Sequence, residues 1–363
     1  MDFLTFNEII KDPLKFQSFV RQLADGFRAP KFSESTVDTY NETTSWKAVT
    51  AFNGRIPMAT SISKYSGKPL IGTEKPIDMF GEMPTFGNKV TFTSKEFNEI
   101  EKYEKAIRQG VTDPTPLINY LNGYFERLAV GPLMTIDKLY FEALSNGTSS
   151  IAAGDIILGL PFSIDWKLKT GYVDTIWSDA ANADGLKDLQ DMADDSRIND
   201  GIIIEKFLMN TTTFKKLQSQ VSVKTQISSY YNGVGGSTYF TGKPNLNAIN
   251  EILTQSLLIA PIVLVDNMVS KYATDGASIA SNTVAFQDNR VAGVVGDIHG
   301  SYLWTPADEQ RRPDSNVIYQ DVNHVLIRTE QKHGKVTFES ELSAIVVPNM
   351  NDEIVILKTD STS

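Results

Sequence analysis

The segment from Thr115 to Gly147 constrains the fold of this chain more than any other stretch of the sequence. Its apolar residues recur at the spacing that keeps them on one face of a helix. Asp113-Pro114-Thr115-Pro116 favours a helix start with Thr115 as the N-cap, and Asn146-Gly147 favours the end. Gly131-Pro132 lies between them. Because a proline removes a backbone donor and clashes with the preceding turn, we expect a kink there or two separate helices.

Two regions precede this helix, and neither has the pattern of an independent domain. Residues 1–60 combine one weak helical segment, near Phe3 to Ala24, with an extended pattern around Thr36 to Ala51, as in an arm that needs a partner surface. Residues 61–110 are rich in glycine, proline and charge, and we interpret them as a long excursion without a core of its own. The elements expected there are a strand at Val90 and Phe92 and a charged helix from Ser94 to Arg108.

Beyond residue 150 short strand patterns alternate with helical ones, which predicts an α+β protein of many short strands. The expected strands are Ile202–Met209, Pro261–Val265, Val284–Phe286, Val291–Val295, Val325–Thr329 and Ile354–Lys358. The expected helices are Ala183–Ala193, Thr212–Ser219 and Leu246–Ser256. Asn232-Gly233 between aromatic flanks predicts a hairpin turn. Its neighbours Tyr230, Tyr231 and Tyr239 then lie on a packed sheet face, with sugar or aromatic-ligand binding as the alternative.

Composition excludes several classes of protein. The 363 residues are 41% hydrophobic and 21% charged, as in an ordinary globular protein, and there is no cysteine for disulfides or thiolate metal sites. The net charge of −10 argues against a dedicated nucleic-acid binder. The longest apolar run, Leu257 to Val265, is interrupted by Pro261 and is much shorter than the roughly 20 residues that span a bilayer. The amino terminus lacks the apolar core of a signal peptide.

Gly296-Asp297-Ile298-His299-Gly300 matches a metal-binding signature of metallophosphoesterases, in which two metal ions activate a water. Such a centre needs further ligands from later Gly-Asp and Gly-Asn-His-Glu segments and from additional histidines. The chain has three histidines, and Asn323-His324 lacks the flanking glycine and glutamate. We therefore considered Asp297 and His299 as metal ligands and rejected them, and we assign no catalytic, cofactor-binding or metal site.

The same stretch then has a structural interpretation. Gly296 and Gly300 would punctuate a strand, and Val294, Val295 and Ile298 would contribute to its packing. Asp297 and His299 would be ordinary polar neighbours.

A second stretch, Asn182-Ala183-Asp184-Gly185, imitates part of a calcium-binding loop. In that register the first ligand position is Ala180 and the last is Asp191 instead of a bidentate glutamate, so the match fails. Asp184 is instead the expected N-cap of the helix that follows.

Four stretches, in this order, resemble the major capsid proteins of tailed bacteriophages of the lambda type, which have the Hong Kong 97 capsid fold. The first is the end of the long helix, and the second runs from Trp177 through the helix after Asp184 to GIIIEKFLMNTTTFKKLQSQ. The third runs from IVLVDNMVSKYATDG to GDIHGSYLWTPADE, and the fourth is VTFESELSAIVVPNMNDEIVILK. The resemblance covers about residues 110–360. The Gly131-Pro132 pair departs from the family, whose spine helix is usually continuous.

The resemblance implies five parts. Residues 1–60 would be an N-terminal arm, 61–110 an extended β-hairpin loop lying across a neighbouring subunit, and 111–180 a peripheral domain with the spine helix. Residues 181–320 would be an axial domain, and 321–363 would be C-terminal strands that return to the peripheral domain.

The function implied is that of a structural head protein, not an enzyme, that self-assembles into hexamers and pentamers of an icosahedral shell around double-stranded DNA. It would lie in the virion capsid, and in the host cytoplasm during assembly. The expected partner is the chain itself, with DNA enclosed without sequence-specific binding and no membrane or cofactor. Scaffolding, portal and decoration proteins stay open as further partners. An encapsulin-like compartment shell is the alternative in the same architecture, and a metal-dependent phosphoesterase is the alternative from another class.

Overall fold

The computed structural model describes residues 6–49, 78–111, 113, 115–151, 161–232, 242–272, 279–311, 318–332, 335–349 and 353–362. The chain divides into two compact units. Unit 1 comprises residues 1–46, 81–137 and 302–346, and unit 2 comprises residues 47–80, 138–301 and 347–363. Each unit therefore combines segments that lie far apart in the sequence.

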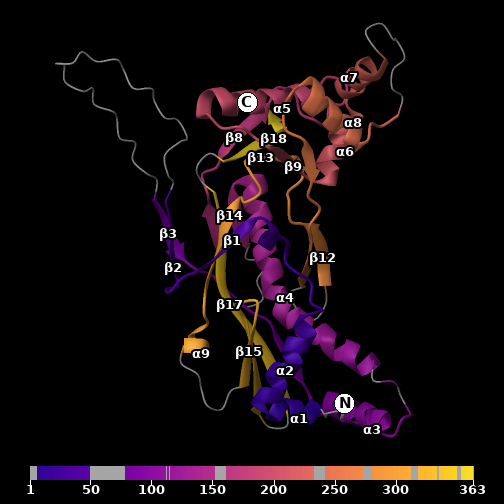
Figure 1. The fold of residues 1–363 in the computed structure, drawn as a ribbon, viewed down its shortest axis with the longest axis vertical. Helices are drawn as coiled ribbons and strands as arrows, with labels where there is room; N and C mark the ends of the chain where they lie inside the picture. The colour runs from indigo at the N-terminus through magenta and orange to yellow at the C-terminus, as the bar shows by residue number, and fades with distance from the viewer. Residues whose placement is uncertain are drawn as a thin grey trace, which may run out of the picture. The chain divides into compact units, whose positions relative to one another are not determined.

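Unit 1 is built around a sheet with helices beside it (Figure 1). The helical elements wholly or partly within it are α1 (Phe6–Lys11), α2 (Pro13–Ala24), the 3-10 turn η1 (Lys31–Glu34), α3 (Ser94–Arg108), α4 (Thr115–Asn146) and α9 (Asp308–Arg311). The strands are β1 (Thr36–Tyr40), β2 (Ser45–Val49), β3 (Asp78–Glu82), β4 (Thr85–Phe86), β5 (Lys89–Phe92), β14 (Gly300–Thr305), β15 (Ile318–Val322), β16 (Val325–Lys332) and β17 (Lys335–Pro348).

The sheet of unit 1 has the strand order β1-β14-β17-β16-β15, and β4 and β5 also pair with β17. From Lys335 to Leu342 the buried side chains of β17 alternate, as expected for a strand with one face on a core, whereas every residue from Ser343 to Pro348 is buried. Five phenylalanines from five elements meet there, and each fully buried ring contributes roughly 1.5–3 kcal/mol of transfer free energy. They are Phe6, Phe16, Phe92, Phe125 and Phe338. The first helices of the chain are therefore part of this core.

Unit 2 is built around a second, mixed sheet. Its helical elements are the rest of α4, then α5 (Gly185–Asp195), η3 (Ser196–Asp200), α6 (Thr211–Ser219), α7 (Val221–Asn232), α8 (Leu246–Glu251) and η4 (Ile252–Ser256). Its further strands are β6 (Thr148–Ile151), β7 (Phe162–Asp165), β8 (Lys169–Val173), β9 (Lys206–Met209), β10 (Ile262–Leu264), β11 (Met268–Tyr272), β12 (Ile279–Val284), β13 (Arg290–Val294) and β18 (Ile354–Thr362).

The sheet of unit 2 has the strand order β10-β9-β13-β18-β8. The pairs β9–β10 and β8–β18 are parallel, whereas β13 is antiparallel to both of its neighbours. Helices α5, α6 and α8 lie beside this sheet (Figure 1). Trp177, Leu186, Leu189, Phe207 and Leu217 are buried in the core that these elements share. The combination of helices with mixed and antiparallel sheets confirms the predicted α+β class.

The capping signals in the sequence place several helices as predicted. Helix α3 has the predicted bounds, and the backbone N–H of Thr93 donates to the Glu96 carboxylate at 2.6 Å. Asp184 is the N-cap of α5 and accepts from the Lys187 backbone N–H at 3.4 Å. Helix α4 ends at Asn146, and Gly147 follows with a φ of 73°. A left-handed residue at this position is why a glycine ends the helix.

Of the two outcomes expected at Gly131-Pro132, the split into two separate helices is wrong, and the kink stays a prediction. Helix α4 is continuous over 32 residues with Pro132 inside it. Residues Leu128, Ala129 and Leu133 on either side are buried, so tertiary packing holds this part of the helix together against the local preference. Neither α4 nor any other helix in the described part of the chain combines the length and apolar character needed to cross a membrane.

Two further predictions are wrong. Residues before Asn232 form helix α7 instead of a hairpin strand, so Tyr230 and Tyr231 lie on a helix and not on a sheet face. Both hydroxyls donate to side chains of α8 and η4, which shows that helix–helix contacts outweigh the strand propensity of this aromatic pair. The strand expected at Val284–Phe286 is instead β12, which ends at Val284. Tyr239 and Gly233 lie outside the described residues.

The expected excursion without a core, residues 61–110, needs a correction in its second half. Residues 61–77 lie outside the described residues, but Phe92 of β5 and Ile100 of α3 are 1% and 3% exposed in the core of unit 1. The charged surface of α3 hid this apolar face in the sequence. The two strands on either side of residues 50–77, β2 and β3, pair as a two-stranded ribbon.

Candidate functional site

The Gly-Asp-Ile-His-Gly segment forms the connection between β13 and β14 in unit 2. Gly296 has a φ of 71°, which favours glycine, and it follows the end of β13. Gly300 begins β14 at a close backbone approach, since a Cβ there would lie 2.7 Å from the carbonyl oxygen of Val347. The two glycines therefore stand at the ends of two strands and do not punctuate one. Val294 is buried as expected, but Ile298 is 44% exposed, because it lies on the connection and not on a strand.

The side chains of Asp297 and His299 have different surroundings. Asp297 is exposed and forms an ion pair with Lys206 of β9, which lowers the pKa of this carboxyl. His299 is buried, and its burial lowers the pKa of the imidazole. The Asp297 carboxylate, which would have to bind the metal ion, is thus already paired with the Lys206 ammonium. Among the residues that the structure describes, no group of three or more His, Asp or Glu side chains could hold a metal ion.

His324, the histidine of the Asn323-His324 pair in the sequence, lies in unit 1. With Asn323 it forms the turn between β15 and β16, where both residues have positive φ. Its ring stacks on Trp304 at 3.8 Å between centroids, and its Nε2 lies 2.8 Å from an Asp38 oxygen. His324 therefore links the hairpin to β1 and has a structural role there. The third, His333, lies outside the described residues.

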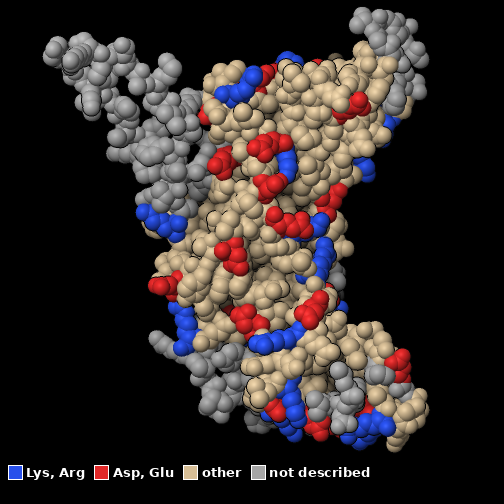
Figure 2. Space-filling model, viewed as in Figure 1, with Lys and Arg blue, Asp and Glu red and all other residues tan. Residues whose placement is uncertain are grey.

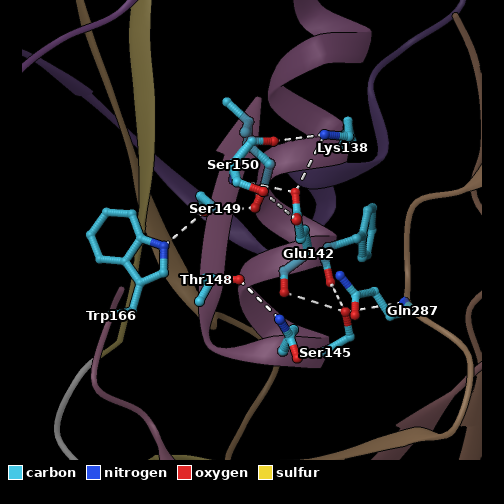
Figure 3. Close-up of polar contacts among 11 residues, drawn as sticks. Lys138, Glu142, Ser145, Thr148, Ser149, Ser150, Trp166 and Gln287 are labelled. Carbon is cyan, nitrogen blue, oxygen red and sulfur yellow. Dashed lines mark hydrogen bonds and ion pairs between the residues drawn. The ribbon is translucent and has the colours of Figure 1, made fainter. Parts of the chain in front are cut away.

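A buried polar cluster in unit 2 surrounds the C-terminal end of α4 (Figure 3). Lys138 and Glu142 form an ion pair at 3.5 Å, with side chains only 18% and 11% exposed. Both then bind Ser150 of β6. Lys138 Nζ donates to the Ser150 carbonyl at 2.7 Å, and the Ser150 hydroxyl donates to Glu142 at 2.7 Å. Each charge therefore has its counter-charge and an additional hydrogen bond, as burial requires.

Two serines extend this cluster, as Figure 3 shows. The Ser149 hydroxyl donates to the Leu139 carbonyl at 2.8 Å and accepts from the buried Trp166 indole N–H at 2.7 Å. The Ser145 hydroxyl accepts from the Gln287 backbone N–H at 3.1 Å. The end of α4 is thus bonded to β6 and to the segment after β12, and β6 is bonded in turn to Trp166, the residue after β7. This cluster is an anchor for the surrounding backbone, and it contains no nucleophile aligned with a free base.

Two buried carboxylates anchor the amino-terminal segment in unit 1. Asp137 of α4 is fully buried and accepts from the backbone N–H groups of Lys31 and Phe32, at 3.1 and 2.7 Å. Glu104 of α3 accepts from the Phe6 backbone N–H at 2.5 Å, and its burial raises the pKa of the carboxyl. Each carboxylate satisfies backbone donors at the start of η1 or α1, which have no partner within their own helix.

The sequence reasoning missed these anchors. Of the two carboxylates, only Asp137 could have been recognised in the sequence. It lies between Ile136 and Tyr140, on the apolar face of a helix that the sequence predicts to be buried. A carboxylate in such a position must find donors when the helix packs. Nothing in the sequence indicates which donors these are.

The β2–β3 ribbon presents one strongly exposed aromatic residue. Phe80 of β3 is 82% exposed, whereas Trp46 of β2 is 3% exposed and lies against Gly81, where a Cβ would be 3.0 Å from the indole nitrogen. A two-stranded ribbon is marginally stable alone. Such a ribbon would gain stability if its exposed apolar side chain were covered.

Charged side chains are interspersed on the face shown in Figure 2, with Lys and Arg close to Asp and Glu. Among the described residues of unit 2, Lys169 forms ion pairs with Asp195 and Asp200, at 2.6 and 2.5 Å. This face therefore carries no broad basic surface of the kind that binds nucleic-acid phosphates.

No protein-family model matches the chain, and no curated protein sequence matches it. Among solved structures, the capsid of Myoviridae Phage XM1 is 11% identical with a TM-score of 0.44, and the match covers 90% of each chain. The virus-like particle from Pyrococcus furiosus is 11% identical with a TM-score of 0.42 (94% of this chain, 96% of that one). The capsid of Cyanophage P-SCSP1u is 11% identical with a TM-score of 0.41 (93% and 90%). These three solved structures are thus two phage capsids and a virus-like particle.

Proposed function

We propose that this chain is the major capsid protein of a tailed phage, a structural subunit that assembles into hexamers and pentamers of an icosahedral shell. The observation that carries the proposal is the order of the parts along the chain. An anchored amino-terminal segment is followed by a two-stranded ribbon, a 32-residue helix, a mixed sheet with helices and two closing strands, β17 and β18. This is the order that the sequence resemblance implies for a capsid subunit.

The predicted division into arm, extended loop, peripheral domain, axial domain and returning strands belongs to this proposal. We assign the extended loop to the ribbon and the residues it encloses, from Ser45 to Glu82, in place of residues 61–110. Phe80 then contacts a neighbouring subunit. Catalysis is not needed for this role, since the free energy of subunit contacts does the work.

The expected partners are copies of the same chain, with double-stranded DNA enclosed in the finished shell. A net charge of −10 suits a container, because fixed positive charge on its lining would hold the DNA and oppose its release. The chain would lie in the virion, and in the host cytoplasm while the shell assembles. Scaffolding, portal and decoration proteins are further candidate partners.

Electron microscopy of the expressed, full-length protein tests this proposal. We expect shells, tubes or capsomer rings, and nucleic acid inside particles purified from an infected host. Phe80→Ser should abolish assembly, whereas the conservative Phe80→Leu should retain it, and thermal unfolding of the dilute subunit should be alike in both variants. A protein that stays monomeric at every salt and protein concentration would refute the capsid role. Particles that enclose a protein cargo instead of DNA would indicate a compartment shell.

A further inference from the structure

The Gly131-Pro132 pair is a feature of α4 that the proposed function leaves unexplained. Pro132 lacks the backbone N–H that would donate to the Leu128 carbonyl, and its ring crowds the preceding turn. Leu128 and Ala129 are 1% exposed, so water cannot readily replace the lost hydrogen bond. A helix with this defect should bend or break here unless another group stabilises it.

Asn88 supplies such a group from the turn between β4 and β5. Its Nδ2 donates to the Arg127 carbonyl at 3.2 Å, one residue before the carbonyl that Pro132 leaves without its donor. All of the residues involved belong to unit 1. The side-chain amide therefore binds the backbone of α4 within the turn that the proline weakens.

Gly131 makes this contact possible. A Cβ at position 131 would lie 2.1 Å from Asn88 Nδ2, so any other residue would displace the amide. Glycine also relieves part of a second problem, because the residue before a proline avoids the helical conformation through clashes of the proline Cδ with its backbone N–H and its Cβ, and glycine has no Cβ. The same glycine thus lets α4 continue to Pro132 and admits the side chain that supports it.

Asn88 is itself held in place by β17. Its backbone N–H donates to the Ser340 hydroxyl at 3.0 Å, and its carbonyl accepts from the Ser340 backbone N–H at 2.8 Å. Gly87 lies so close to β17 that a Cβ there would be 2.2 Å from the Ser340 carbonyl oxygen. The amide is therefore presented by a turn fixed to the sheet, and it loses little conformational entropy when it binds the helix.

We propose that Asn88 is a splint for α4: its side-chain amide keeps the helix continuous across the defect at Gly131-Pro132, and its withdrawal lets the helix open there. The turn that carries Asn88 lies a few residues beyond the end of β3. A displacement of the segment between β3 and β5 would withdraw the amide and open the helix. The splint is a property of the isolated chain and does not depend on the capsid role.

A double-mutant cycle with Asn88→Ala and Pro132→Ala tests the splint in the full-length chain. Amide hydrogen exchange is measured over residues 128–137, with residues 185–195 of α5 as an internal reference. Asn88→Ala should raise exchange in α4 by about tenfold, the factor expected for one lost hydrogen bond. In the Pro132→Ala background the backbone N–H of residue 132 can donate to the Leu128 carbonyl, so this turn of α4 depends less on Asn88. Asn88→Ala should then change exchange much less.

Gly131→Ala provides the matched control for the close approach. It should raise exchange in α4 when Asn88 is present, and this effect should shrink in the Asn88→Ala background, where the clash is gone. Equal effects of Asn88→Ala with and without Pro132 would overturn the proposal, because Asn88 would then stabilise only its own turn. Unchanged exchange in α4 on loss of Asn88 would overturn it as well.

Discussion

At the scale of single residues, buried polar groups determine how the folding stability of this chain depends on pH. Asp188 of α5 accepts from the Trp177 indole N–H at 2.7 Å. Burial and, to a lesser extent, repulsion from the neighbouring Asp174, Asp184 and Asp191 raise the pKa of this carboxyl to about 6, against the lowering effect of the indole N–H. Because the folded pKa exceeds the unfolded value of 3.8, the stabilising contribution is complete at low pH and is lost as pH rises through about 6.

We therefore expect Asp188→Asn to stabilise unit 2 at pH 7.5. The asparagine oxygen still accepts from Trp177, but no charge is buried, so the gain after allowance for solvent screening should be on the order of 1 kcal/mol. The gain should shrink as pH falls from 6 towards 4. Urea unfolding followed by tryptophan fluorescence at several pH values measures it. Asp188→Leu is the control, since it removes the charge but leaves the indole N–H without its acceptor and should destabilise the protein.

At the scale of elements, the sequence predicted best where local signals and tertiary packing agree. Helix α3 has the predicted bounds because its capping residues and its apolar face indicate the same segment. Helix α4 shows the opposite case, since Gly131-Pro132 predicts a break that Asn88 and the surrounding core override. Contacts with residues far along the chain carry no local signal, so neither the continuous helix nor the backbone donors that Asp137 and Glu104 bind could be predicted.

The junction between α4 and β6 should depend strongly on the Lys138–Glu142 pair. Lys138→Met leaves a largely buried carboxylate without its counter-charge, which should cost about 3 kcal/mol of unfolding free energy. The double variant Lys138→Met/Glu142→Leu removes both charges and should recover most of that loss. Thermal and urea unfolding of the three proteins measure the difference.

Lys187 and Asp191 of α5 form the matched exposed pair, at the same spacing on a helix but with side chains 57% and 61% exposed. Lys187→Met should cost much less unfolding free energy than Lys138→Met, because water screens exposed charges. Similar losses at both sites would show that the cluster in Figure 3 is not an anchor.

At the scale of the whole molecule, neither compact unit is a single continuous segment of the chain. Both units combine segments from the first and last thirds of the sequence, and β17 contributes to each. The order of elements was predictable because each has its own periodicity, whereas the assembly of units from distant segments depends on strand pairings that leave no local trace. The Gly-Asp-Ile-His-Gly match shows the same limit of prediction from local sequence. The motif does not indicate that the Asp297 carboxylate pairs with Lys206, which lies 91 residues away in the sequence.

Assembly should make the stability of the chain depend on its concentration. In the proposed capsid role another copy covers the exposed Phe80 and the two-stranded β2–β3 ribbon, and binding to the folded state alone raises the free energy of unfolding by mass action. The midpoint of thermal unfolding should therefore rise with protein concentration, by an amount that corresponds to about 1.4 kcal/mol for each tenfold increase well above the dissociation constant. Phe80→Ser should remove this dependence and leave the midpoint of the dilute subunit unchanged. A midpoint that is constant over a thousandfold concentration range in the parent protein would contradict stabilisation by subunit contacts.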